Sequence, residues 1–210
     1  MADLDTHNRN HRELEFYFEF ASPYAYFASL AVEDLCARHG LELVWKPVML
    51  GAILKTTGER PLLSDGIRGD YARMDCLRWA ARHGLPFRLP PVFPTNSLKA
   101  ARGAVWLEGR PERAAYIHAC FRAHWVDGRE LFDDEVMADI VKGLGLEPDH
   151  FFTAISQPAL KQRLIDQTEA ARQRGVFGAP TFIYGNEMVW GNDRMGLLEA
   201  IIAEHGAPGP

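Results

Sequence analysis

The residues that most clearly suggest chemistry are a serine and a proline at the point where a strand pattern changes to a helix pattern. In FYFEFASPYAYFASL, residues 16–30, Ser22 takes the N-cap position of the expected helix and Pro23 its first helical position. A helix N-terminus has unpaired N–H groups and the positive end of the dipole, so it favours a bound anion. Ser22 either only caps the helix, or its hydroxyl also stabilises a thiolate that a cofactor brings.

A second motif is GVFGAPTFIYGNEMVWGNDR, residues 175–194. Pro180 opens an expected strand, where it belongs at the strand start and can be cis, although trans is the default form of an X–Pro bond. Asn192 and Asp193 open the expected last helix and are explained most simply as a cap and a first-turn carboxylate. Alternatively, free amides there could bind a carboxylate while Asp193 binds an ammonium group, which together describe the headgroup of an amino acid.

Cysteine and histidine residues give weaker signals. Cys36, Cys76 and Cys120 are odd in number, far apart and without CxxC spacing, which argues against a disulfide framework and a zinc site. We expect buried free thiols, with a catalytic cysteine as the alternative. His118 and His124 are six residues apart on an expected helix and so lie on different faces, and we expect no metal site.

The elements around the first motif form a strand, helix, strand unit. Residues 14–20 alternate between apolar and polar side chains, which is the period of a strand. Helical spacing begins at Pro23, and Gly40 supplies the residue that ends such a helix. Residues 41–48 alternate again, and the crossover is long enough to join parallel strands.

The middle of the chain, about residues 64–174, is predicted to be almost entirely helical. The end of the chain returns to a strand pattern over 181–185 and 187–191, with a turn at Asn186 and a last helix from Asp193 to about Glu204. This order predicts an α/β domain with an all-helical insertion. The amphipathic segments of the middle, each closed by Gly or followed by Pro, are 69–84, 97–109, 111–126, 133–146 and 158–175.

Composition excludes several classes of function. The 210 residues are 47% hydrophobic and carry a formal net charge of −5, so there is core-forming material and no basic footprint for nucleic acid. No apolar run approaches the ~18 residues of a membrane-spanning helix. Residues 1–12 are polar and without an apolar stretch, so we expect a flexible N-terminus and a cytoplasmic protein.

Three motifs in this order resemble one protein family. SPYAYF after a strand, GVFGAPTF before a strand, and WGNDR at the start of the C-terminal helix resemble the DsbA-like thioredoxin superfamily. The similar branch is that of 2-hydroxychromene-2-carboxylate isomerases and kappa-class glutathione transferases, and the resemblance covers nearly the whole chain. It implies a thioredoxin-like domain over 13–63 and 175–206, interrupted by a helical insertion domain over 64–174.

The resemblance also implies a cofactor. Redox members have a CPxC-type motif where this chain has Ser22, Pro23, Tyr24 and Ala25, so dithiol exchange at that position is excluded. The family's alternative is bound glutathione as the thiol, with Ser22 as the catalytic residue beside its sulfur.

Further residues are assigned to ligands by the resemblance alone. Lys55 in segment 48–61, expected to be a loop, is assigned to a carboxylate of substrate or glutathione, although a solvated lysine is the simpler interpretation. Segments 61–69 and 93–97 receive no assigned contacts. The residues assigned to glutathione are Ala179, which precedes the cis-proline Pro180 and pairs its backbone with the cysteine of glutathione, and Trp190, Gly191, Asn192 and Asp193, which hold the γ-glutamyl end.

The implied activity is the glutathione-dependent conversion of 2-hydroxychromene-2-carboxylate to trans-o-hydroxybenzylidenepyruvate, a reaction of aromatic hydrocarbon degradation. Thiolate addition, rotation about the resulting single bond and expulsion of the thiolate would accomplish it. The alternatives are a kappa-type transferase that conjugates an electrophile, and a thioredoxin-like binding protein without catalysis. The expected partners are glutathione, a small aromatic carboxylate and a second copy of the chain, with no nucleic acid or membrane.

Overall fold

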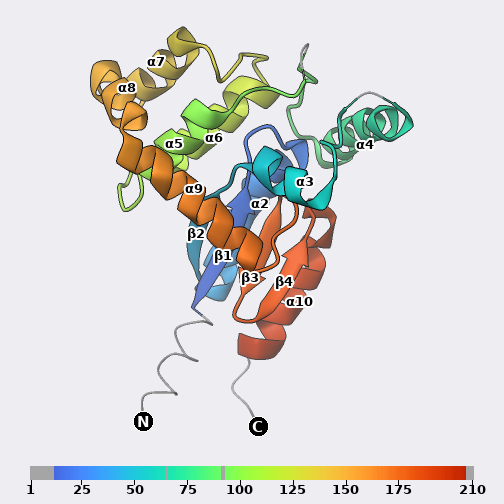
Figure 1. Ribbon diagram of the computed structural model, residues 1–210. Helices are drawn as coiled ribbons and strands as arrows, with labels where there is room; N and C mark the ends of the chain where they lie inside the picture. The colour runs from blue at the N-terminus through green and yellow to red at the C-terminus, as the bar shows by residue number, and fades with distance from the viewer. Residues whose placement is uncertain (1–11, 65, 91–92, 207–210) are drawn as a thin grey trace, which may run out of the picture.

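A four-stranded sheet forms the centre of the computed structural model, which describes residues 12–64, 66–90 and 93–206 (Figure 1). Its strands are β1 (Glu13–Phe18), β2 (Glu42–Pro47), β3 (Thr181–Tyr184) and β4 (Glu187–Trp190), in the order β2-β1-β3-β4. The pair β1 and β2 is parallel, whereas β3 is antiparallel to β1 and β4 is antiparallel to β3. The predicted parallel unit and the C-terminal hairpin are therefore confirmed.

Both faces of the sheet are covered. Leu14, Phe16, Phe18 and Phe20 are fully buried in the main core, as the alternating pattern predicted. On the opposite face, Tyr17 belongs to a second buried cluster that takes residues from the helices α3 (Leu50–Thr57) and α9 (Pro158–Gln173). The strand itself ends at Phe18, so residues 19 and 20 already belong to the corner that leads into the next helix.

That next helix is α2 (Pro23–His39), which begins and ends where the sequence predicts. Gly40 ends it with a left-handed φ of 63°, and its N–H binds the carbonyls of Ala37 and Cys36. On the same side of the sheet, α10 (Met195–Gly206) packs against α2. A 3₁₀ turn, η1 (Asn192–Arg194), precedes α10, so the α-helix begins two residues later than expected.

The middle of the chain is helical, with α4 (Ile67–His83), α5 (Leu98–Trp106), α6 (Arg113–Trp125), α7 (Asp134–Gly143), α8 (Pro148–Ser156) and α9. Neither α8 nor α3 was expected. The prediction of a loop over 48–61 is wrong, because Leu50, Ile53 and Leu54 have helical spacing and Gly58 closes α3 with a φ of 73°. Sheet and insertion share one hydrophobic cluster, and the domain boundaries stay a prediction.

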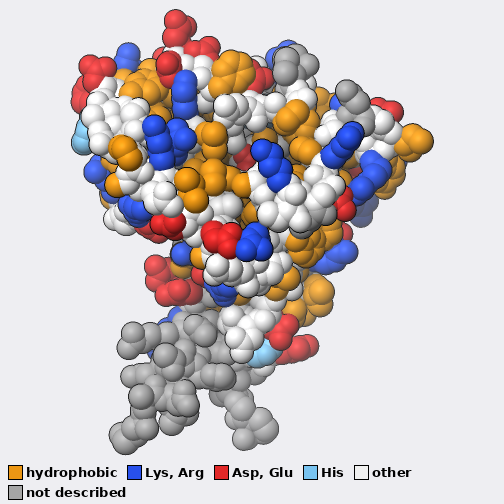
Figure 2. Space-filling model, in the orientation of Figure 1, with side chains coloured by type: hydrophobic (Ala, Val, Ile, Leu, Met, Phe, Trp, Pro, Cys, Tyr) orange, Lys and Arg blue, Asp and Glu red, His pale blue; other side chains and the backbone are white. Residues whose placement is uncertain are grey.

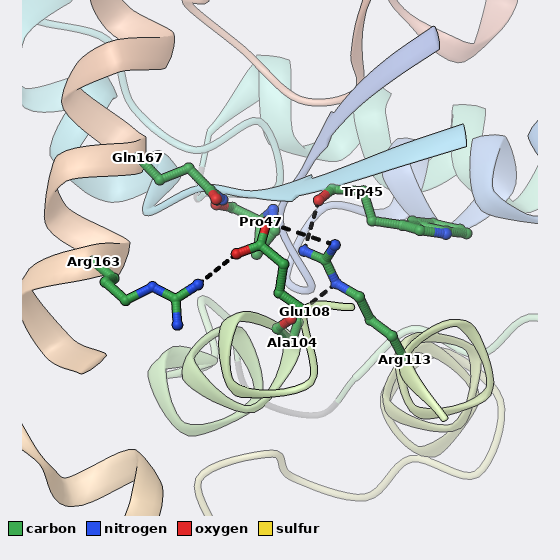
Figure 3. A network of polar contacts seen from close by, with 7 residues as sticks. All are labelled: Trp45, Pro47, Ala104, Glu108, Arg113, Arg163 and Gln167. Carbon is green, nitrogen blue, oxygen red and sulfur yellow. Dashed lines mark hydrogen bonds and ion pairs between the residues drawn. The ribbon is translucent and has the colours of Figure 1, made fainter. Parts of the chain in front are cut away.

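A largely buried arginine connects this helical block to the edge of the sheet (Figure 3). Arg113 of α6 donates to the carbonyl of Trp45 on β2 at 2.8 Å and to the carbonyl of Ala104 on α5 at 3.0 Å. Burial lowers the pKa of Arg113, which nevertheless stays charged. Nearby, Arg163 of α9 pairs with Glu108 at 2.5 Å on the surface. The insertion is thus attached through the backbone carbonyl of Trp45 on β2 as well as through apolar packing.

The three cysteines are buried thiols, as the sequence predicts. Cys36, Cys76 and Cys120 are free and buried. Burial raises the pKa of Cys36 to about 11 and that of Cys76 to about 12, which argues against a catalytic cysteine. Within the described ranges no three His, Cys, Asp or Glu side chains gather as a metal site, and none of the helices there is long and apolar enough to cross a bilayer.

Candidate active site

A cavity of about 600 Å³ lies beside the corner between β1 and α2. Its walls come from this corner, from α3, and from segments 59–63, 93–98 and 177–179, with Arg68 and Trp190. Most of these side chains are apolar, and a few charged groups stand among them. A concave apolar space with a few polar groups is the usual form of a small-molecule site.

Ser22 lies on the cavity wall and is buried. Its Oγ accepts a hydrogen bond of 3.2 Å from the N–H of Ala25, so it is the N-cap of α2. The same hydroxyl donates to the carbonyl of Ala179 at 2.8 Å. The cap interpretation is therefore correct, and the hydroxyl also connects two segments 157 residues apart that the sequence assigned to one site.

The peptide bond between Ala179 and Pro180 is cis, the form that the family resemblance implied. Ala179 lines the cavity, whereas Pro180 is buried behind it and accepts a hydrogen bond of 3.0 Å from the N–H of Gly191. A second cis bond, between Phe93 and Pro94, lies on the cavity wall and was not expected.

The WGND segment, residues 190–193, borders the cavity through its first residue only. Trp190 lines the cavity and packs on Phe177, with ring centroids 5.0 Å apart. Gly178 allows this close approach, because a Cβ there would lie 2.4 Å from Nε1 of Trp190. Gly191, with a φ of 105°, also has no room for a side chain, since a Cβ would meet Oδ1 of Asp193 at 2.4 Å.

Asn192 and Asp193 differ in exposure. The side chain of Asn192 is buried, and its Nδ2 has no hydrogen-bond partner among the described residues. Asp193 is exposed and contacts Arg194 at 3.3 Å. A buried amide without a hydrogen-bond partner lowers the stability of the folded protein, so an unpaired Nδ2 such as that of Asn192 is uncommon.

Lys55 reaches the cavity from the last turn of α3, although the sequence placed it in a loop. Arg60 and Arg68 also line the cavity, and Arg68 contacts Glu59 at 3.6 Å. Lys55 is thus one of three basic side chains at this wall, and the other two carried no signal that set them apart from solvated surface residues.

Glu19 is a site residue that sequence reasoning missed. It lines the cavity and accepts hydrogen bonds from the N–H of Ala21, at 2.8 Å, and from the hydroxyl of Ser97. Burial raises the pKa of Glu19 to about 7. A signal existed, because a carboxylate three residues before Ser22 in an apolar segment is unusual. The alternation of the predicted strand instead placed Glu19 on the face opposite the apolar side chains.

Comparison with known sequences identifies the family. The model of the DSBA-like thioredoxin domain matches residues 13–203. The chain belongs to this family. A 2-hydroxychromene-2-carboxylate isomerase of Pseudomonas putida is 32% identical over 189 residues, which cover 89% of this chain and 92% of that protein. Glutathione S-transferase kappa 1 of Rattus norvegicus is 25% identical over 211 residues, 92% of each chain.

Solved structures give the same result. The structure of a 2-hydroxychromene-2-carboxylate isomerase superposes with a TM-score of 0.82 at 30% identity, covering 92% of this chain and 95% of that one. The cytosolic disulfide reductase DsbM of Pseudomonas aeruginosa, solved with GSH, has a TM-score of 0.66 at 20% identity and shows the shared fold, with 92% and 98% covered. These isomerases and transferases are enzymes, and the chain is an enzyme of this group.

Proposed function

We propose that the protein is a glutathione-dependent isomerase that converts 2-hydroxychromene-2-carboxylate to trans-o-hydroxybenzylidenepyruvate, a step in the degradation of aromatic hydrocarbons. The observation that carries the proposal is a serine, in place of a redox thiol, on the wall of an apolar cavity in a chain 32% identical to such isomerases over most of both lengths.

The residues of the cavity and of the adjoining segment 190–193 fit glutathione as the cofactor. The unpaired Nδ2 of Asn192 is a buried donor for the carboxylate of the γ-glutamyl end, and the exposed carboxylate of Asp193 suits its ammonium group. Trp190 lines the cavity beside them and Gly191 forms the bend that follows it, while Ala179, next to cis-Pro180, offers its backbone to the cysteine. Glutathione, when bound, would supply a thiolate that adds reversibly to a conjugated enone. The former double bond is then a single bond, about which rotation is possible.

Ser22 stabilises the sulfur of glutathione and does not attack the substrate. Its hydrogen-bond partners are two backbone groups, the N–H of Ala25 and the carbonyl of Ala179, so no base activates it as a nucleophile. Rotation about the Cβ–Oγ bond turns the proton from the carbonyl of Ala179 towards a bound thiolate. The N-terminus of α2 adds its dipole to the same position.

The substrate is a small aromatic carboxylate. Apolar walls such as Leu54, Leu63 and Phe93 suit the aromatic ring, and Lys55 supplies a cation for the carboxylate. Arg60 and Arg68 at the same wall make this end of the cavity attractive to anions in general.

The direct test is the ultraviolet spectrum of 2-hydroxychromene-2-carboxylate mixed with the protein, with and without glutathione. Appearance of the trans enone only when glutathione is present supports the proposal. A folded, glutathione-binding protein that leaves the spectrum unchanged contradicts it.

The second candidate function is a kappa-type transferase, which the similarity to glutathione S-transferase kappa 1 favours. A transferase forms a stable conjugate and consumes one thiol for each product, whereas isomerisation consumes none. A non-catalytic binding protein, the third candidate, would bind glutathione with Ser22 dispensable.

We also propose a homodimer formed through one face of α4. Ile67, Tyr71, Met74 and Leu77 are exposed at helical spacing, and hydrophobic side chains show over this end of the molecule (Figure 2). In an antiparallel pair of α4 helices centred on Met74, Asp70 of one copy lies opposite Arg78 of the other, so the face is complementary to itself.

The location of the protein stays a prediction from the sequence. Three buried free cysteines, Cys36, Cys76 and Cys120, are typical of a reducing compartment and agree with the cytoplasm.

A further inference from the structure

Glu19 places a fixed carboxyl group on the wall of the cavity. Its Oε2 accepts a hydrogen bond of 2.8 Å from the N–H of Ala21, and its Oε1 accepts one from the hydroxyl of Ser97. Each carboxylate oxygen has a further lone pair, so both oxygens can still accept a proton or a hydrogen bond from a ligand. The group is thus held from two sides and still borders the substrate space.

Burial controls the protonation of Glu19. It is the largest cause that raises the pKa of this group to about 7, while the hydrogen bonds from Ser97, Ala21 and Phe20 oppose the shift. Carboxylate and carboxylic acid are therefore both populated near neutral pH. Four charged groups share the cavity wall with Glu19, namely Lys55, Glu59, Arg60 and Arg68. The surrounding elements also carry His124 on α6, whose pKa is lowered by burial, and Glu130, which accepts a hydrogen bond from Thr95. Lys99 pairs with Asp134.

The proposed substrate requires acid–base chemistry before its double bond can rotate. It is a cyclic hemiketal, and the open form arises only when the ring C–O bond breaks. The hydroxyl oxygen and the ring oxygen are bonded to the same carbon. One carboxyl group, with its two oxygens, can therefore serve both of them.

We propose that Glu19 is the acid–base residue that opens this ring, an inference that rests on the substrate proposed above. A carboxylate oxygen of Glu19 takes the proton of the hemiketal hydroxyl, and the electron pair of that O–H bond becomes the second bond of the new carbonyl. The ring C–O bond breaks, and its electron pair stays on the phenol oxygen. The carboxylic acid of Glu19 then returns the proton to the phenol oxygen, so that Glu19 ends as the carboxylate and no other reactant is consumed.

Ring opening can be measured without glutathione, which separates this step from isomerisation. The experiment is NMR exchange spectroscopy between the cyclic and open forms of 2-hydroxychromene-2-carboxylate with catalytic amounts of protein, repeated across the pH range around 7. The wild-type exchange rate is expected to rise with pH as Glu19 loses its proton, and to level off above its pKa of about 7. Glu19→Gln is expected to lower the rate by about 100-fold, the lower end of general acid–base effects, and to remove this rise.

Two further variants separate chemistry from structure. Glu130→Gln makes the same chemical change in a carboxylate that does not line the cavity, and it is expected to keep the wild-type rate and pH dependence. Ser97→Ala removes a hydrogen bond that lowers the pKa of Glu19, so the rise is expected at higher pH. A merely structural role of Glu19 would change the rate without moving this midpoint.

The outcomes distinguish the two proposals. The role of Glu19 is overturned if Glu19→Gln keeps the wild-type exchange rate, or if the wild type isomerises the substrate with glutathione without accelerating ring opening. If ring opening depends on Glu19 but glutathione gives no trans product, the inference stands and the proposed isomerase function fails.

Discussion

Two side chains at the corner between β1 and α2 carry the proposed chemistry. Ser22 joins the N-terminus of α2 to the carbonyl of Ala179, which places its hydroxyl where two distant segments meet. Glu19, three residues earlier, is fixed by Ser97 and the N–H of Ala21. The first group is suited to stabilise an anion and the second to move a proton, and both line the same cavity.

The first prediction at this scale concerns Ser22→Ala. We expect kcat to fall about 100-fold, as for the loss of one donor to a developing anion, with glutathione affinity nearly unchanged. Loss of the N-cap is expected to lower the free energy of unfolding by about 1 kcal/mol. Steady-state kinetics, calorimetric titration of glutathione and urea unfolding measure the three effects.

The matched control is Ser29→Ala, the same change about two helical turns farther along α2. Ser29 is buried and donates to the carbonyl of Tyr26, but it does not line the cavity. We expect it to keep wild-type kcat. Equal kcat values for Ser22→Ala and the wild type would remove Ser22 from the mechanism.

The second residue-scale prediction follows from the raised pKa of Glu19. The pKa is about 7 in the folded protein and 4.5 when the group is unperturbed, so the folded state holds the proton more tightly. The stabilisation is present in full below pH 4.5 and is lost as the pH rises to 7. The loss is about 3 kcal/mol for a shift of this size.

Glu19→Gln has no such titration. The free energy of unfolding of this variant minus that of the wild type is therefore expected to increase by about 3 kcal/mol between acidic pH and pH 8, because only the wild type loses stability over this range. Urea unfolding of both proteins across this range measures the difference. A difference that does not change with pH would mean that Glu19 titrates normally in the folded protein.

At the scale of elements, the parts that position the site were predicted unequally well. The helix α2 has strong start and stop signals in its own sequence, with Ser22 and Pro23 at its start and Gly40 at its end. Both predicted ends match the structure. By contrast, α3 is only eight residues long and was predicted as a loop. Its apolar spacing was present in the sequence, but Gly58 was taken as part of a loop rather than as the end of a helix.

The cavity walls were harder to predict than the motifs. Segments 59–63 and 93–98 have no regular pattern, and they meet at the cavity although they lie far apart in the sequence. No local property of a sequence encodes such a distant contact. Glu19 illustrates the same limit, because its burial depends on Ser97, which lies 78 residues away.

The element-scale prediction concerns Arg113, which joins α6 to β2. Arg113→Ala leaves the carbonyls of Trp45 and Ala104 without their donor, and the buried side chain is only 12% exposed. We expect the free energy of unfolding to fall by about 2–4 kcal/mol, the cost of two unpaired buried groups.

Arg163→Ala is the control, since this arginine also pairs with Glu108 but is 53% exposed. Its loss is expected to cost less than 1 kcal/mol, the usual value for a surface ion pair. Chemical unfolding of the two variants measures the contrast. Similar losses for both would show that the carbonyl contacts of Arg113 contribute little.

At the scale of the whole molecule, the thioredoxin-like part provides the corner, the cis-proline, α3 and residues 59–63, while the insertion adds Arg68 and segment 93–98 to the cavity wall. The fold class was predicted from the order of the elements together with three motifs, and the family match over residues 13–203 confirms it. Within the insertion, the helix α4 has four large exposed apolar side chains, Ile67, Tyr71, Met74 and Leu77.

The prediction at this scale is that Met74→Asp abolishes the homodimer, because it places a charge at the centre of the proposed interface. Light scattering after size exclusion is expected to give twice the chain mass of 23.6 kDa for the wild type and the chain mass for the variant. Ile165→Asp, at an equally exposed apolar residue on α9, is expected to stay dimeric. A monomeric wild type, or a dimeric Met74→Asp, would contradict the assigned face.

The most direct test of the central claim is a count of thiols during turnover. The protein is mixed with 2-hydroxychromene-2-carboxylate and an amount of glutathione well below that of the substrate, while the trans enone is followed by its absorbance and free thiol by titration. We predict complete conversion with no loss of thiol. Product formation that stops when the glutathione is consumed would contradict the isomerase and identify a transferase.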